Sequence, residues 1–229
     1  MENYKFSKPL SLPRGTHYGN SYLIIPSRKI GRNVTAFSNL EYENILTLEM
    51  NPHVEYFCEQ PLKVHVYIGG EIKDTIFDCW VKYVDGREEY QEVKYYSELN
   101  ADNDKGKRCR EQVGAQKAWC IQNGETYNLR TDKNIELGDY YIRNLSFLAA
   151  KARRFSTPNK EAERYIRNYL DGLGRTTVGF LDTSGRFEKY RTMDYLAYLA
   201  YIGAIKFENI ENEIISFKTE VIYIGSEGI

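Results

Sequence analysis

The sequence lacks the features that mark several large classes of protein. No stretch approaches the roughly 18 consecutive apolar residues of a membrane-spanning helix, and the first residues lack the apolar run of a secretory signal. We therefore expect a cytoplasmic protein with no membrane partner. The four cysteines form no Cys-x-x-Cys pair, so neither a zinc site nor a redox motif is indicated. A Gly-rich phosphate loop is also missing, so the chain itself should not hydrolyse ATP.

The chain as a whole has almost no excess of either charge, because its formal net charge at pH 7 is −1. This balance argues against a protein that coats nucleic acid through electrostatics alone. Two segments differ from it, because residues 103–117 carry a net charge of +3 and residues 151–167 carry +4. The basic residues of the first segment are Lys105, Lys107, Arg108, Arg110 and Lys117. We expect them either to form a solvated helix face or to lie along a DNA backbone.

What is present is typical of a soluble globular chain, with 42% hydrophobic and 28% charged residues among 229. Domains usually contain about 100–200 residues, so the length favours two of them. In the segment Ser156-Thr157-Pro158, the threonine can cap a new helix and the proline suits its first turn. We therefore predict a first domain at residues 1–150 and a second at residues 151–229.

The first domain is predicted to contain a helix, a run of antiparallel strands, and further helices around one more strand. After an irregular N-terminal arm, Ser38 opens a helix with a Ser-x-x-Glu capping box, and the helix ends at residues 51–52. Strands are expected at 54–58, 62–68, 74–84, 88–96 and 126–130, and helices at 107–122 and 140–153. This order indicates an α/β (α+β) fold with a mixed sheet and helices packed on it.

The second domain is predicted to contain helices that end in a two-stranded hairpin, which describes a winged helix. Helices are expected to about residue 170 and at 193–202, and strands at 204–208 and 214–224. The hairpin carries Glu208, Glu211 and Glu213, and phosphate would repel an acidic wing. We therefore expect the wing to contact a protein partner and not DNA.

A lone aspartate, Asp78, lies within an apolar strand pattern, where an unpaired carboxylate would be costly to bury. Glu92 and Lys94 are two residues apart on the next strand, so they share one face of the sheet. A three-residue loop at 84–86, with Gly86 in the left-handed conformation, would pair Asp78 with Glu92. A two-residue loop would put them on opposite faces. In the first register two carboxylates and an ammonium converge, as a Mg²⁺-dependent phosphodiesterase requires.

A third carboxylate is expected from the helix that begins after Ser38. At about 100° per residue, both Glu41 and Glu49 fall inside the apolar sector of this helix. Glu41 has an alternative role as the third residue of the capping box. Periodicity alone does not choose between the two glutamates.

In order and spacing, these residues resemble the TnsA endonuclease subunit of heteromeric cut-and-paste transposases. The similarity lies in Ser38-Asn39-Leu40-Glu41, Asn51-Pro52-His53-Val54, Glu59-Gln60-Pro61, Asp78 and Glu92-Val93-Lys94. That family has a restriction-endonuclease-like core of the PD-(D/E)xK type followed by a winged-helix domain, so the resemblance implies this fold. Phe77 stands where the wider superfamily usually has proline, which shapes the strand and is not a ligand.

The resemblance also implies roles for individual residues. Glu41, Asp78, Glu92 and the Val93 carbonyl would be ligands of Mg²⁺, for which Mn²⁺ can substitute. Lys94 would be the catalytic lysine, and Gln60 would support the site. At the position of Glu92 this family also uses glutamine, which makes Glu92 the most dispensable of the acids.

The function implied is a Mg²⁺-dependent DNA endonuclease that cleaves the 5′ strands of transposon-end DNA. A DDE transposase, TnsB, would cut and join the 3′ ends, and an AAA+ ATPase, TnsC, would regulate the complex. Two alternatives stay open. One is an independent PD-(D/E)xK repair or restriction nuclease, and the other is a DNA-binding assembly protein on a catalytically decayed nuclease fold.

Overall fold

The computed structural model describes residues 4–11, 22–68, 70–154, 160–185 and 191–225. The chain forms two compact units, one of Met1–Ile45 and Val54–Ile135, the other of Leu46–His53 and Glu136–Ile229. This division differs from the predicted boundary at residue 150, because helix α5 (Tyr141–Ala152) packs on helix α8 (Thr192–Tyr201) of the second unit. The predicted cap at Ser156-Thr157-Pro158 lies outside the described residues.

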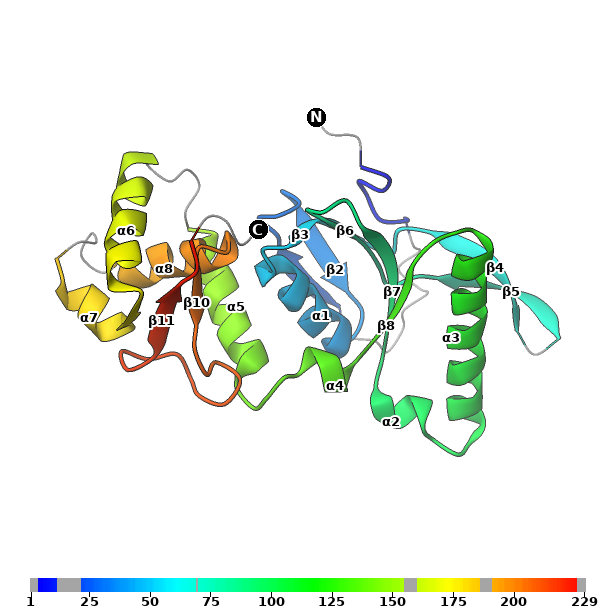
Figure 1. Cartoon of the computed structure of the whole chain (residues 1–229). Helices are drawn as coiled ribbons and strands as arrows, with labels where there is room; N and C mark the ends of the chain where they lie inside the picture. Colours follow the sequence, from blue (N-terminus) through cyan, green and yellow to red (C-terminus); the bar gives the residue numbers. More distant parts are fainter. Residues whose placement is uncertain (1–3, 12–21, 69, 155–159, 186–190, 226–229) are drawn as a thin grey trace. The chain divides into compact units, whose positions relative to one another are not determined.

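The first unit is built on a four-stranded sheet, as Figure 1 shows. Its order is β3 (Val54–Glu59), β6 (Cys79–Tyr83), β7 (Glu88–Lys94) and β8 (Tyr127–Thr131). β6 is antiparallel to both neighbours, whereas β8 runs parallel to β7. The predicted mixed sheet is therefore confirmed.

Helices α1 (Asn39–Met50) and α3 (Asp104–Gln122) contact opposite faces of this sheet. Successive residues of a strand point to opposite faces, and two neighbours on β7 show the consequence. The side-chain oxygen of Gln91 (Oε1) accepts a hydrogen bond from the Asn44 side-chain amide of α1 (2.8 Å), and the Glu92 carboxylate accepts one from the Gln116 side-chain amide of α3 (2.9 Å). The apolar core includes the fully buried side chains of Phe57, Phe77, Trp80 and Tyr90.

The single strand predicted at residues 74–84 is wrong, because the chain changes sheets inside it. β5 (Glu71–Ile76) pairs only with β4 (Lys63–Ile68) in a separate two-stranded ribbon, and β6 begins at Cys79. Phe77 and Asp78 form the junction. The Phe77 N–H donates to the Leu62 carbonyl (3.3 Å), while the Asp78 N–H donates to the Gln91 carbonyl of β7 (3.1 Å). Asp78 therefore lies between two strands, and the alternation of side chains along a regular strand does not set the direction of its side chain.

The three-residue loop predicted between β6 and β7 is confirmed. The Tyr83 N–H donates to the Arg87 carbonyl (2.8 Å), and Gly86 has a left-handed φ of 86°. The resulting register pairs Cys79 with Gln91, so the next position places Asp78 beside Glu92 at the end of the ladder.

Several smaller elements of the first unit differ from the predictions. The N-terminal arm contains an antiparallel pair, β1 (Leu23–Pro26) and β2 (Asn33–Ala36), where irregular structure was expected. Two short helices, α2 (Tyr96–Leu99) and α4 (Asp132–Ile135), were not predicted. Helix α3 begins three residues early because the Asn103 side chain accepts a hydrogen bond from the Gly106 N–H (2.9 Å).

The second unit contains α5, α8, three strands and two further helices. These are α6 (Lys160–Leu173), β9 (Arg175–Thr177), α7 (Val178–Thr183), β10 (Ile205–Phe207) and β11 (Glu220–Tyr223). The three strands form an antiparallel sheet in the order β10-β11-β9. The predicted hairpin is present, although its second strand is shorter than expected, and β9 and α7 were missed. No helix within the described segments has the length and apolar character needed to cross a membrane.

The loop between β10 and β11 carries the acidic residues predicted for the wing, and α5 holds it. The buried Asn144 amide donates to the carbonyls of Ile210 and Glu213 (2.7 Å each), and its own carbonyl accepts from the Ile215 N–H (3.1 Å). One side chain thus fixes this loop to the helix.

The register at the site should depend on Gly86. We expect Gly86→Ala to lower the free energy of unfolding by about 1 kcal/mol, because a residue with a Cβ is strained in the left-handed conformation. An added Cβ would meet no atom within 4 Å, so the loss would be conformational and not a clash. Urea unfolding measures it.

Gly114→Ala is the matched control, because Gly114 lies within α3 and its added Cβ also meets nothing within 4 Å. This change should stabilise the protein by about 0.5–1 kcal/mol, since alanine is favoured inside a helix. Equal stability of the two variants would contradict the role given to the turn.

Candidate active site

Asp78 is held by backbone hydrogen bonds on three sides. Its N–H donates to Gln91, its carboxylate accepts from the Val93 N–H (2.7 Å), and its carbonyl accepts from the Gln60 N–H (3.0 Å). Gln60 itself adopts a positive φ of 38°, an uncommon conformation for a residue with a side chain. The backbone of Gln60 thus lies against the site, and its predicted supporting role stays a prediction.

Glu92 and Lys94 form a close ion pair on the same face of β7. The Lys94 Nζ lies 2.6 Å from Glu92 Oε1, and the Glu92 side chain is 1% exposed. Two glutamines of α3 also donate to this carboxylate, Gln112 to Oε1 (3.1 Å) and Gln116 to Oε2 (2.9 Å). Both oxygens of Glu92 therefore have donors.

Glu41 forms the predicted capping box and also faces Asp78. Its N–H donates to Ser38 Oγ (3.1 Å), while its carboxylate accepts from Ser38 Oγ and from the Phe37 N–H (3.0 Å each). Glu41 and Asp78 also line a small cavity of about 10 Å³. The two roles that the sequence left as alternatives for Glu41 are thus compatible. Glu49 is buried two turns further along α1, among residues of the second unit, and does not line this cavity.

The charges of these four residues act on one another. Burial raises the pKa of Asp78. Burial, and then the charge of Asp78, raise the pKa of Glu41 to about 7 and that of Glu92 to about 8. Burial alone would lower the pKa of Lys94, but the charges of Glu92 and Asp78 outweigh it and raise this pKa. Asp78 is the common neighbour, and Lys94 neutralises part of the negative charge around it.

The oxygen donors of this site are those that Mg²⁺ prefers. Glu41 and Asp78 border a cavity that has room for about one water-sized group. Across the described ranges, no three His, Cys, Asp or Glu side chains are grouped closely enough to hold a metal ion. The donor chemistry fits a small divalent cation beside Asp78 and Glu41, whereas other side chains bind the carboxylate of Glu92.

The basic residues predicted to lie along DNA are all exposed on α3. Three of them have partners within the protein. Lys105 pairs with Glu98 (2.6 Å), Lys107 lies 4.0 Å from Glu111, and Arg110 donates to the carbonyls of Leu99 and Ala101. Arg108 and Lys117 are exposed on the same helix. Contact with DNA stays a prediction for all five.

Two residues of the second basic segment lie near a buried carboxylate. Lys151 and Arg154 lie 3.4 and 3.9 Å from the buried carboxylate of Asp194 on α8. These two side chains therefore balance a buried charge within the second unit.

Sequence reasoning missed Gln112, Gln116 and Asn44, which hold the site residues or their strand. The two glutamines lie four residues apart, so they share a helix face. That face also contains Cys109 and Cys120, and it is buried against the sheet. A polar pair within an otherwise apolar buried face was the available signal.

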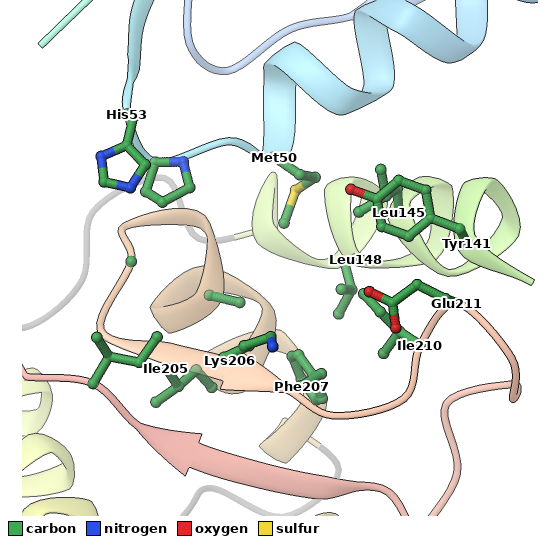
Figure 2. A pocket seen from close by; sticks show the side chains of 14 residues that line it. Met50, His53, Tyr141, Leu145, Leu148, Ile205, Lys206, Phe207, Ile210 and Glu211 are labelled. Atoms are coloured by element: carbon green, nitrogen blue, oxygen red, sulfur yellow. The ribbon is translucent and has the colours of Figure 1, made fainter. Parts of the chain in front are cut away.

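A larger pocket of about 310 Å³ lies in the second unit, as Figure 2 shows. Its lining is mainly apolar and includes Met50, Leu145, Leu148, Phe207 and Ile210. It contains none of the predicted site residues.

Residues 51–132 match the family model of the TnsA-like endonuclease N-terminal domain. The chain carries a TnsA-like endonuclease domain. The matched segment contains Asp78, Glu92 and Lys94 together with β3 to β8 and α3, whereas Glu41 precedes it. The resemblance identified from the sequence is thus confirmed for this TnsA-like domain. No protein with a curated description matches the chain.

The raised pKa of Glu41 should appear in the stability of the metal-free protein. Burial and the charge of Asp78 raise the pKa of Glu41 in the folded state to about 7, above its ordinary value of 4.5, so folding favours the protonated form. This contribution is fully present below pH 4.5 and is lost as pH rises through 7. Glu41→Gln removes the titration and keeps an amide in the capping box. We expect it to stabilise the protein by about 2 kcal/mol at pH 8.

At pH 5 this gain should be much smaller. Thermal unfolding in a chelator measures it, with an expected rise in melting temperature of about 5 °C at pH 8. The exposed Glu136→Gln is the control and should change neither value. A gain for Glu41→Gln that is the same at both pH values would contradict the charge coupling.

Proposed function

We propose that the chain is a Mg²⁺-dependent DNA endonuclease subunit of a heteromeric transposase, which cleaves the 5′ strands at transposon ends. The observation that carries this proposal is the convergence of Asp78, Glu92 and Lys94 inside the segment that matches the TnsA-like domain. Burying several carboxylates around one ammonium lowers the stability of a protein, so such a cluster indicates a functional site. Metal-dependent phosphodiester hydrolysis uses both of its parts, because the carboxylates can hold a cation and the ammonium provides a fixed positive charge.

Asp78, Glu41 and the Val93 carbonyl would hold the ion, and the predicted ligand role of Glu92 stays a prediction. When bound, Mg²⁺ neutralises phosphate charge and lowers the pKa of a bound water. Lys94 stays protonated because its pKa is raised, so its ammonium can stabilise the negative charge that develops on the phosphate. Buried surroundings strengthen this interaction compared with water.

The second unit fits a winged-helix module, with α6, α7 and α8 beside the sheet of β9, β10 and β11. Its acidic loop is unsuited to phosphate, so we propose that this loop contacts a protein partner. TnsB and TnsC are the partners that the family implies, and the chain would act with them in the cytoplasm on transposon-end DNA. The competing function is an independent repair or restriction nuclease.

The site assignment predicts that Asp78→Ala and Lys94→Ala each reduce strand cleavage by about 10²–10³-fold or more, because each removes charge that stabilises the transition state. Folding and partner binding should persist, since little apolar packing is lost and Glu92, whose pKa is raised to about 8, can take up a proton where Lys94 is removed. The matched controls are Asp74→Ala and Lys82→Ala, which change exposed or partly exposed residues of neighbouring strands. A gel assay of end-labelled transposon DNA measures the rates. Cleavage at the wild-type rate by either site variant would end the assignment.

The helix offers a paired test of the third carboxylate. Glu41→Gln should be inactive, because it removes a charge beside Asp78, whereas Glu49→Gln should remain active. The reverse result would show that Glu49 carries the role.

Cleavage by the isolated chain should be weak. A net charge of −1 with two short basic segments neutralises few phosphates, so DNA affinity should be low and should fall steeply with salt. We expect correctly placed 5′-strand cleavage only when the DDE transposase is added and the complex is activated. A site variant in that complex should still allow 3′-end joining and shift the products towards co-integrates. Specific end cleavage by the chain alone at physiological salt would favour the independent nuclease.

A further inference from the structure

Two glutamines of α3 donate hydrogen bonds to the carboxylate of Glu92. The Gln112 amide donates to Glu92 Oε1 (3.1 Å) and to Thr75 Oγ1 (3.2 Å). The Gln116 amide donates to Glu92 Oε2 (2.9 Å) and to Thr75 Oγ1 (3.0 Å). Gln116 is 0% exposed and Glu92 1% exposed. The contact between Gln116 and Glu92 is therefore shielded from water.

The orientation of the Gln116 amide follows from its neighbours. The Tyr127 hydroxyl donates to Gln116 Oε1 (3.4 Å), which leaves the Nε2 group to face the carboxylate. Beside the Lys94 ammonium, Glu92 accepts hydrogen bonds, and Gln116 Nε2 also donates to the Ile76 carbonyl (3.5 Å), which cannot donate, so this amide orientation satisfies all of its partners. The hydrogen-bond network thus fixes Gln116 as a donor to Glu92.

These contacts leave Glu92 little freedom. Oε1 accepts from both Lys94 (2.6 Å) and Gln112, and Oε2 accepts from Gln116. Lys94 alone would not fix the carboxylate, because an ammonium on a flexible four-carbon side chain can follow a rotating partner. Because Gln116 holds Oε2 of Glu92, the direction of Oε1 is fixed. Oε1 in turn fixes the position of the Lys94 ammonium.

We infer that Gln112 and Gln116 are positioning residues, which act through Glu92 to hold Lys94 in the site. In this arrangement Glu92 serves the lysine, because Lys94, Gln112 and Gln116 take up most of the lone-pair positions of its carboxylate. Asp78 and Glu41, which line the small cavity, are then the carboxylates that a metal ion would meet. The expected effect on cleavage rests on the proposed nuclease function, but the effect of the two glutamines on Lys94 can be tested without a cleavage assay.

The test follows the side-chain ammonium of Lys94 by NMR in the full chain labelled with ¹⁵N-lysine, with Lys94→Arg used to assign the signal. We expect hydrogen exchange of this group to become roughly tenfold faster in Gln116→Leu and in Gln112→Leu. Gln122→Leu, at an exposed position of the same helix, is the matched control and should behave as wild type. If Gln116→Leu does not fold, Gln112→Leu carries the test, because Gln112 is only half-buried.

Binding of Mn²⁺ alone, followed by calorimetry, is the second measurement. The affinity should be unchanged in the glutamine variants and much weaker in Asp78→Asn. Removing a group that supports a true metal ligand typically costs about 10–100-fold in affinity. A loss of that size in the glutamine variants would make Glu92 a ligand and overturn the inference. Unchanged exchange at Lys94 in both glutamine variants would also overturn it.

Cleavage of transposon-end DNA with the partner transposase separates this inference from the proposed function. We expect the maximal rate to fall by about 100-fold in Gln116→Leu, with the Mn²⁺ requirement unchanged, because a small displacement of a catalytic group is costly. A wild-type chain that shows no cleavage in the active complex, while Lys94 exchange responds as expected, would refute the nuclease function and leave the positioning inference standing.

Discussion

The first unit depends on the burial of negative charge around one ammonium. Glu92 is buried, Asp78 and Glu41 are half-buried, and Lys94 is the cation that meets them. Burial disfavours charged forms, so this group is stable only with many donors and with little net charge. The protein supplies backbone N–H groups to Asp78, side-chain amides to Glu92 and a helix cap to Glu41. The proposed metal ion would neutralise the negative charge that these donors leave uncompensated.

The surrounding structure places these groups through buried polar contacts. On the α1 face, Arg130 donates to Asn44 (3.0 Å), which in turn donates to Gln91 (2.8 Å), so the helix is attached to β7 one turn after Glu41. At the edge of the sheet, both terminal nitrogens of Arg32 lie 2.6 Å from the oxygens of buried Glu59. Glu59 precedes Gln60, whose N–H binds Asp78. The buried polar groups thus restrict the backbone on both sides of the site.

Much of the site could be predicted because its signals are local. The capping box fixed Glu41 on its helix, and Asp85-Gly86 in a three-residue turn predicted the register of Asp78 against Glu92. The strand break at Phe77 could not be predicted, because the alternation of residues 74–84 is the same in one strand as in two. The roles of Gln112 and Gln116 were also missed, since they arise from helix α3 packing across the sheet, a contact between segments distant in sequence. The sequence pattern indicates which chemical role a residue can take, whereas tertiary packing determines which residues it contacts.

The junction at Phe77 and Asp78 separates the β4–β5 ribbon from the sheet that carries the site. Strand β5 belongs to the separate ribbon and ends at Ile76, just before Asp78, while the pairing of β6 with β7 is set by the turn at residues 84–86. The number of residues in the β4–β5 ribbon therefore has no influence on which residue lies beside Glu92. Insertions or deletions at the tip of the ribbon, near Gly70, could accumulate during evolution without moving the carboxylate. The ribbon can diversify in length and sequence as a peripheral module, while the chemistry beside it stays in register.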